Sequence, residues 1–201
     1  MKKPKIRELL EAVRALFKGP YTSRFPRQPS PAAPRFRGKI EFDPATCILC
    51  GACVEVCPVK ARAQTDDRGR RFRREIHYQE RCVYCGQCVQ YCTTKTGIRH
   101  TPVYDLAQTT KDGYENAVEG ELIVCERCGE PITSRAHLRW IARRVGELAY
   151  ANPNLFLVLG QELGEDFTPP NSEPPPYRSD HLRFLCPACR RTVYLQELWG
   201  Y

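Results

Sequence analysis

Eight of the twelve cysteines in this 201-residue chain fall into two runs with the same spacing. Each run reads C-x2-C-x2-C-x3-C, and the second repeats all four positions 35 residues after the first. The members are Cys47, Cys50, Cys53 and Cys57, followed by Cys82, Cys85, Cys88 and Cys92. Three thiolates on one tight loop can converge on three corners of an iron-sulfur cube, so the duplicated spacing predicts two 4Fe-4S clusters. Zinc sites or core thiols at these eight positions would not account for the duplication.

The fourth cysteine of each run is expected to serve the other cluster. A helical turn carries it away from its own loop, and in two-cluster ferredoxins it ligates the second cube. We therefore expect one cluster on Cys47, Cys50, Cys53 and Cys92, and the other on Cys82, Cys85, Cys88 and Cys57. Gly51 and Gly86 follow the second cysteine of each loop, where a side chain would crowd backbone amides that turn toward cluster sulfur.

The two runs differ after their last cysteine. Pro58 follows Cys57, as the motif expects, whereas Thr93 follows Cys92. The fourth ligand is retained, but the turn after it is expected to be rebuilt. Hydrogen bonds from the threonines of this turn would tune the potential of one cluster.

The other four cysteines form two CxxC knuckles, Cys125 with Cys128 and Cys186 with Cys189. Two knuckles can supply four thiolates in a tetrahedron, as in structural zinc sites. The 57 residues between them exceed the common spacing of about 15–20. We predict one structural metal ion here, zinc before iron, with free thiols as the remaining alternative. A zinc finger that reads nucleic acid is disfavoured, because residues 41–201 carry 20 basic and 21 acidic side chains.

Composition indicates a soluble globular protein whose thiols bind metal. The chain is 42% hydrophobic and 27% charged. Met1 is followed by Lys2, Lys3 and Pro4 without an apolar leader region, so we expect reduced cysteines rather than a disulfide framework. The longest apolar run, 155–159, is far shorter than the roughly 20 residues of a membrane span.

No catalytic motif accompanies the cysteines. A nucleophile elbow, a phosphate loop and a dinucleotide fingerprint are all missing from the sequence. The four histidines follow no ligand spacing and are interpreted as surface or core residues; they are His77, His100, His137 and His181. We therefore expect a subunit that is not an enzyme by itself.

The predicted fold class is α+β, with a duplicated two-cluster ferredoxin domain over residues 41–104. Each half is expected to contain a strand, a cysteine loop with a helical turn, and a returning strand; 40–42 and 76–78 are the strands that precede the loops. Residues 66–69 are typical of a turn. The arginines of residues 70–74 are interpreted as solvated.

A C-terminal lobe, residues 105–201, is expected to hold the CxxC/CxxC metal site in a zinc-ribbon-like arrangement. Leu138, Ile141, Val145 and Leu148 mark a helix that begins at Thr133 or Ser134 and ends near residues 152–153. Residues 155–159 are predicted to be a buried strand, and residues 164–180, with five prolines, a surface loop.

The N-terminal extension, residues 1–40, combines an amphipathic helix with a proline-rich arm. Its apolar positions recur at helical spacing and are Ile6, Leu9, Leu10, Val13, Leu16 and Phe17. Five prolines follow between residues 20 and 34. The extension holds eleven Lys or Arg against two Glu, which suggests an anionic membrane surface or an acidic partner.

These motifs resemble one family. The stretches 34–39, 47–58 and 81–88 resemble subunit I of complex I, a two-cluster iron-sulfur subunit, and its hydrogenase relatives. The C-terminal half, with a CxxCG knuckle, a helix and a late CPxCR knuckle, resembles the iron-sulfur subunit of formate hydrogenlyase and of hydrogenase-4, which are group 4 membrane-bound nickel-iron hydrogenases.

The resemblance implies an electron-transfer subunit that relays single electrons within a membrane-bound hydrogenase or complex I-related oxidoreductase. Expected partners are catalytic subunits, an integral membrane subunit and another iron-sulfur protein, with the N-terminal helix on the membrane surface and no nucleic acid. The expected location is cytoplasmic, peripheral on the inner face of the cell membrane. Two alternatives remain: subunit I of a quinone oxidoreductase fed by NADH or another donor, and a stand-alone ferredoxin-type adaptor.

Overall fold

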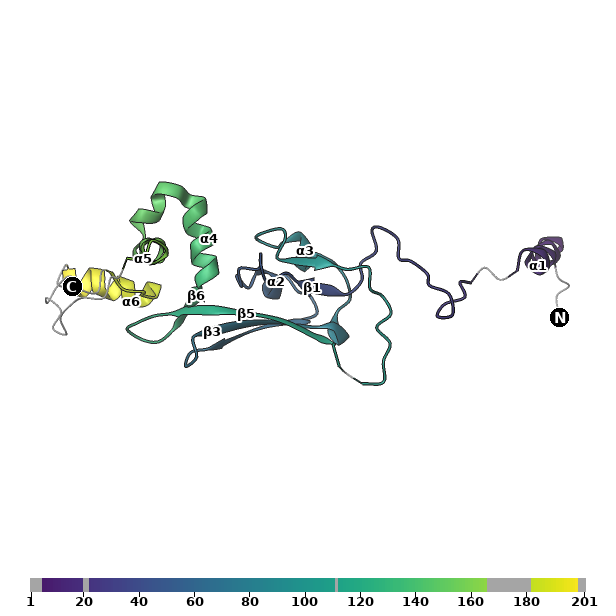
Figure 1. The fold of residues 1–201 in the computed structure, drawn as a ribbon, viewed down its shortest axis with the longest axis horizontal. Coiled ribbons are helices and arrows are strands. Elements are labelled where there is room, and N and C mark those ends of the chain that lie inside the picture. The colour runs from purple at the N-terminus through teal and green to yellow at the C-terminus, as the bar shows by residue number, and fades with distance from the viewer. Residues whose placement is uncertain (1–4, 20–21, 111, 166–181, 199–201) are drawn as a thin grey trace. The chain divides into compact units, whose positions relative to one another are not determined.

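The computed structural model describes residues 5–19, 22–110, 112–165 and 182–198 (Figure 1). Of these, residues 196–198 are described by their backbone alone. It divides the chain into two compact units, Met1–Phe36 and Arg37–Tyr201. Within the described residues, no helix combines the length and the apolar character needed to cross a bilayer.

The first unit contains the helix α1 (Ile6–Lys18) and an extended segment after it. At the start of α1, the Lys5 backbone N–H donates to the Glu8 carboxylate at 3.0 Å. Gly19 ends the helix at a φ of 75°, which favours glycine. The predicted apolar positions are all exposed, from 48% at Val13 to 88% at Phe17.

The second unit is built on two antiparallel sheets. A small sheet pairs β1 (Ile40–Phe42) with β4 (Ile98–His100). The larger sheet has the order β2-β3-β5-β6, formed by β2 (Arg62–Asp67), β3 (Phe72–Tyr78), β5 (Glu115–Val124) and β6 (Pro131–Ser134). Because β5 pairs along the whole of β3, the sheet that begins in the cysteine repeat continues into the C-terminal lobe (Figure 1).

The cysteine repeat has a repeated backbone. Its two short helices, α2 (Ala52–Glu55) and α3 (Gln87–Gln90), lie 35 residues apart and contact each other. Positive φ angles recur at the same offset in three pairs, namely Leu49 and Tyr84, Gly51 and Gly86, and Lys60 and Lys95. Such angles are uncommon for residues other than glycine, so their recurrence shows that both loops fold in the same way. A 3-10 turn, η1 (Gln79–Arg81), leads into the second loop.

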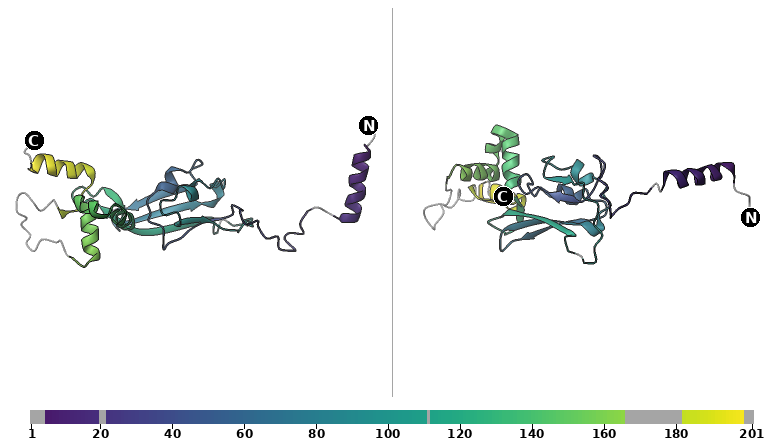
Figure 2. Two further views of the ribbon diagram at one scale, coloured as in Figure 1. Left: turned by 90° about the horizontal axis from the view of Figure 1, so that it is seen from above. Right: turned by 45° about the vertical axis from the view of Figure 1, so that its right-hand side comes forward.

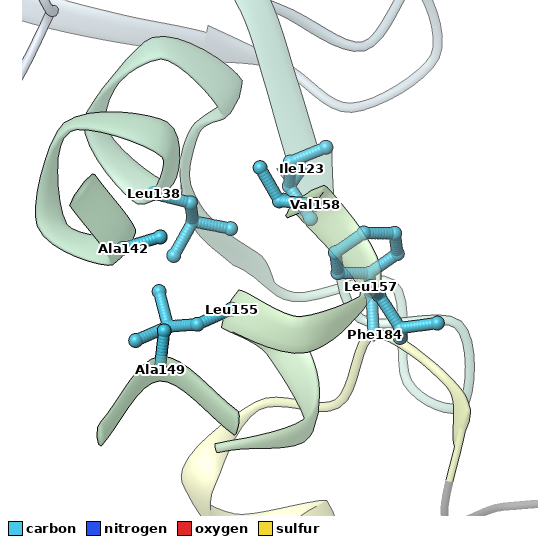
Figure 3. Packing of buried hydrophobic residues seen from close by; sticks show 8 residues of the cluster. All are labelled: Ile123, Leu138, Ala142, Ala149, Leu155, Leu157, Val158 and Phe184. Atoms are coloured by element: carbon cyan, nitrogen blue, oxygen red, sulfur yellow. The ribbon is translucent and has the colours of Figure 1, made fainter. Parts of the chain in front are cut away.

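The C-terminal lobe packs its helices at one end of the larger sheet, as two further views show (Figure 2). They are α4 (Arg135–Val145), η2 (Gly146–Ala151), α5 (Pro153–Glu162), α6 (Pro187–Thr192) and η4 (Val193–Leu198). Ser134 caps α4 by accepting a hydrogen bond from the His137 backbone N–H at 3.1 Å. The core between α4, α5 and β5 is apolar, with Leu138, Leu157 and Val158 facing Ile123 and Phe184 (Figure 3).

Two interpretations of the sequence are wrong. Residues 155–159 are helical within α5, because Asn152 caps the helix and Pro153 occupies its first position. Arg73 is buried at 6% exposure, and its guanidinium forms a two-pronged ion pair with Asp66 across the β2–β3 hairpin at 2.7 and 2.8 Å. The predicted loop at 164–180 lies almost wholly outside the described residues.

Candidate cluster and metal sites

The structure gathers the eight repeated cysteines around two cavities, four at each. Cys47, Cys50, Cys53 and Cys92 line one, which we call the first cavity. Cys57, Cys82, Cys85 and Cys88 line the other, the second cavity. The last cysteine of each run therefore lies with the first three of the other run, because α2 and α3 carry it across the core.

The two cavities share one apolar core. Phe42 of β1 lines the first cavity and Ile40 of the same strand lines the second. Residues two apart on a strand are separated by about 7 Å, so the cavities are close neighbours. Ile98 and Val118 complete the packing between them.

The donor set and the backbone fit iron-sulfur clusters. All eight thiols are free rather than paired in disulfides. Gly51 and Gly86 adopt φ angles of 78° and 81°, and a Cβ on Gly51 would lie 2.6 Å from the Gln64 side-chain oxygen. Burial raises the pKa of Cys47 to about 11 and that of Cys53 further. Bound iron would have to displace these protons.

Thr93, the residue in place of proline, lies against a cysteine of the first cavity. Its hydroxyl is 3.2 Å from Cys50 Sγ. The Thr94 hydroxyl is 3.4 Å from Cys92 Sγ and accepts the Gly97 N–H at 3.0 Å. The turn after Cys92 therefore closes through a threonine side chain and places hydroxyl groups beside two sulfur atoms.

Polar and charged side chains buried beside the cavities were not anticipated from the sequence. Glu75, at 1% exposure, lines the first cavity and accepts hydrogen bonds from Gly51 N–H at 2.8 Å and Cys53 Sγ at 3.1 Å. Arg62, at 4%, and His77, at 1%, line the second cavity. The signal was the alternation of β3, which places Arg73, Glu75 and His77 on one face.

The two CxxC knuckles meet in the C-terminal lobe. Their four sulfur atoms, from Cys125, Cys128, Cys186 and Cys189, all lie within 4.8 Å of one another. Cys128 Sγ and Cys186 Sγ are 3.7 Å apart. Four sulfurs at about 2.3 Å from a tetrahedral zinc would be separated by about 3.8 Å, so the donor set fits such an ion.

Backbone groups hold the two knuckles together and prepare one thiol for metal. The Glu126 N–H donates to Phe184 C=O at 2.9 Å, and the Phe184 N–H returns a bond to the Glu126 carboxylate at 3.2 Å. Burial opposes ionisation of Cys125, but backbone N–H groups near its sulfur lower its pKa to about 6. Contact with the Cys128 thiol raises the pKa of Cys189 to about 12.

Comparison with known proteins finds one family model over the stretch that contains both cysteine runs. Residues 46–96 match the family model of the 4Fe-4S dicluster domain. NAD(P)H-quinone oxidoreductase subunit I from the chloroplasts of Chloranthus spicatus and of Nuphar advena is 40% identical over 58 residues, covering 26% of this chain and 32% of each relative. The Dioscorea elephantipes protein of that name is 48% identical over 40 residues, 20% of this chain and 22% of the relative.

A solved structure also shows some likeness. It belongs to the membrane-bound sulfane sulfur reductase, an archaeal respiratory membrane complex, with 29% identity, a TM-score of 0.41, and coverage of 55% of this chain and 59% of that one. The match to the curated relatives spans about a third of their length. Residues 46–96 thus match the 4Fe-4S dicluster domain, and part of the chain is homologous to NAD(P)H-quinone oxidoreductase subunit I.

Proposed function

We propose that the chain is an electron-relay subunit in which two 4Fe-4S clusters exchange single electrons between partner proteins. The observation that carries this proposal is the pair of four-cysteine cavities in one core. Cys47, Cys50, Cys53 and Cys92 would hold one cluster, and Cys57, Cys82, Cys85 and Cys88 the other. Each cluster supplies a one-electron couple, while the chain orients the ligands and excludes water. The buried core around the thiols supports this division of roles.

Cluster content and ligand sharing test the proposal together. Anaerobically purified protein should contain about eight irons in its two cubes and give two EPR signals on reduction. Cys57→Ser should alter the same signal as Cys82→Ser, and Cys92→Ser the same signal as Cys47→Ser. The matched comparison is decisive: if Cys57→Ser and Cys47→Ser alter one common signal, each run holds its own cluster. A single cluster, or zinc in these positions, would overturn the proposal.

We further propose that the relay operates in a membrane-associated oxidoreductase complex of the hydrogenase or complex I type. The homology to NAD(P)H-quinone oxidoreductase subunit I favours a quinone-linked complex. The paired knuckles of the C-terminal lobe are the feature for which we propose the formate hydrogenlyase-like or hydrogenase-4-like assembly. Identifying the subunits that co-purify with the native chain distinguishes the two: a nickel-iron catalytic subunit supports the second, and NAD(P)H-oxidising or quinone-binding subunits support the first.

At the CxxC/CxxC site we propose one structural metal ion, zinc before iron. The close approach of the four sulfurs and the lowered pKa of Cys125 support it. The ion would join β5–β6 to α6 and so close the lobe. Metal analysis of protein with both clusters intact tests this site. An iron content that the two clusters account for in full, together with no zinc, would exclude it.

A further inference from the structure

The second cavity contains a buried positive charge, the guanidinium of Arg62. Arg62 is 4% exposed, and neither of its terminal nitrogens has a hydrogen-bond partner in the part of the chain that the structure describes. The guanidinium carbon lies 4.9 Å above the Phe42 ring, a contact that leaves the N–H groups unsatisfied. A buried guanidinium without a partner is costly, and in native structures such a group normally has a ligand. Arg62 lies in the cavity wall with four cysteines, where sulfur of a bound cluster would be such an acceptor.

The other described lining residues add no further charge beside Arg62. They are the four cysteines, His77, Gln87 and apolar or glycine residues. His77 does not add a second charge, because burial and the nearby Arg62 lower its pKa to about 4. Arg62 is therefore the fixed cation of the second cavity among its described lining residues.

The first cavity is lined by a carboxyl group instead of a cation. Glu75 occupies its wall, bonded to Gly51 N–H and to Cys53 Sγ. No arginine is among the described residues that line this cavity, and Arg73, which reaches the Leu49 carbonyl at 3.4 Å, has its charge compensated by the ion pair with Asp66. The strand register explains the contrast. Arg62 pairs with His77 at the open end of the β2–β3 hairpin, while Glu75 lies two residues before His77, nearer the turn.

We propose that Arg62 raises the reduction potential of the cluster in the second cavity above that of the other cluster, so that the second-cavity cluster is reduced first. This rests on the proposed function, because it requires two bound clusters. Reduction adds one electron from a one-electron donor, makes the cluster one unit more negative, and forms or breaks no bond. A buried cation stabilises the added charge with little screening by water. The Thr93 hydroxyl would raise the potential of the first-cavity cluster and so narrow the difference between the two. Hydrogen bonds from a charged donor are roughly twice as strong as neutral ones, so the effect of Arg62 is the larger.

Redox titration of three variants tests the role of Arg62. Arg62→Gln retains a polar side chain without charge. In this variant the ratio of electron occupancy on the second-cavity cluster to that on the first should fall about tenfold, which corresponds to a decrease of about 59 mV in the difference between the two reduction potentials. Arg62→Lys keeps the charge and should restore most of the separation. Glu75→Gln is the matched control at the first cavity and should leave the second-cavity potential in place. Unchanged separation in Arg62→Gln, or failure of lysine to restore it, overturns the proposal.

If Arg62→Gln fails to retain its iron, the order of reduction can still be measured on wild-type protein that carries 15N-labelled histidine. His77 lines the second cavity, and no histidine is among the described residues that line the first. After growth with 15N-histidine, pulsed EPR at the potential where only one cluster is reduced should detect 15N coupling. If that first signal lacks the coupling, the first-cavity cluster is reduced first and the inference is wrong. If the wild type holds fewer than two clusters, the proposed function fails instead.

Discussion

Thr93 and Pro58 occupy equivalent places in the two cysteine runs, and only the threonine can donate a hydrogen bond to sulfur. Its hydroxyl lies 3.2 Å from Cys50 Sγ. A donor to cluster sulfur stabilises the reduced, more negative state. This one substitution therefore makes the two cavities chemically different although their backbones repeat.

Replacing Thr93 by valine should lower the potential of the first-cavity cluster by about 20–60 mV, taking a net hydrogen bond of about 0.5–1.5 kcal/mol and one electron. EPR-monitored redox titration measures the shift. Thr96→Val is the matched control, because the Thr96 hydroxyl donates to the Thr94 carbonyl at 3.4 Å and not to a cysteine sulfur of the described chain. An equal shift in both variants, or a shift of the second-cavity cluster, would contradict the role of Thr93.

The charged residues at the two cavities could not be predicted from the sequence, whereas the cysteines could. Cysteine spacing was sufficient to group eight thiols, because a repeat encodes its own geometry. Arg62 and Glu75 carry no motif, and whether a charged side chain is buried depends on which face of the hairpin meets the core. The alternation of β3 was visible, but a face made of Arg73, Glu75 and His77 reads as solvent-exposed unless a buried ligand is considered.

At the scale of elements, the first turn of α4 contains a half-buried histidine, His137. Burial lowers the pKa of His137 from its ordinary value of 6.5, and the positive charge of Arg73 acts in the same direction. The Nδ1 atom lies 2.9 Å from the Thr133 hydroxyl. A positive charge at a helix N-terminus is also unfavourable to the macrodipole.

This arrangement predicts loss of stability in acid. Below pH 6.5 the unfolded chain takes up a proton on His137 that the folded chain resists, so the free energy of unfolding falls as the pH falls. His137→Gln keeps a polar partner for Thr133 and should show a weaker dependence between pH 6.5 and 5. Thermal unfolding across this range provides the measurement. Parallel curves for the two proteins would show that His137 does not titrate differently on folding.

The CxxC/CxxC site makes a second prediction at this scale. Cys125→Ser should remove the proposed metal ion and destabilise the helices of the C-terminal lobe, because α6 joins β5–β6 mainly through the knuckles. Hydrogen exchange should increase across residues 120–195, while both cluster EPR signals remain. Cys128→Ser, at the exposed position of the same knuckle, provides a comparison. Unchanged exchange in both variants would contradict a structural role for a metal ion.

Element prediction succeeded where two independent signals agreed. The start of α4 combined helical periodicity with a cap predicted at Thr133 or Ser134, and Ser134 is the observed cap. The run at 155–159 had only an apolar composition, which does not distinguish a buried strand from a buried helix. The Asn152-Pro153 pair predicts the end of one helix, whereas in the structure it begins another. The pairing of β5 with β3 is a long-range contact that no local pattern encodes.

At the scale of the whole molecule, the N-terminal extension combines charge with an uncovered apolar stripe. Residues 1–40 hold eleven Lys or Arg against two Glu. The described part of α1 has no buried residue, and Leu16 and Phe17 are 83% and 88% exposed. Large apolar side chains clustered at helical spacing normally bury against another surface. We propose an anionic membrane surface beside an integral subunit as that surface.

Deleting residues 1–20 should release the chain from its membrane complex while both clusters still assemble. Anionic headgroups contribute roughly 1 kcal/mol for each nearby Lys or Arg, and burial of the apolar stripe adds to this. Two point variants separate the contributions: Leu10→Ser weakens the stripe, whereas Arg14→Gln removes an exposed charge that is already paired with Glu11 at 2.9 Å. Membrane fractions washed at increasing salt, with the chain quantified by immunoblot and iron content, give the result. If the truncated chain stays bound at high salt as firmly as the full chain, the anchor lies elsewhere in the molecule.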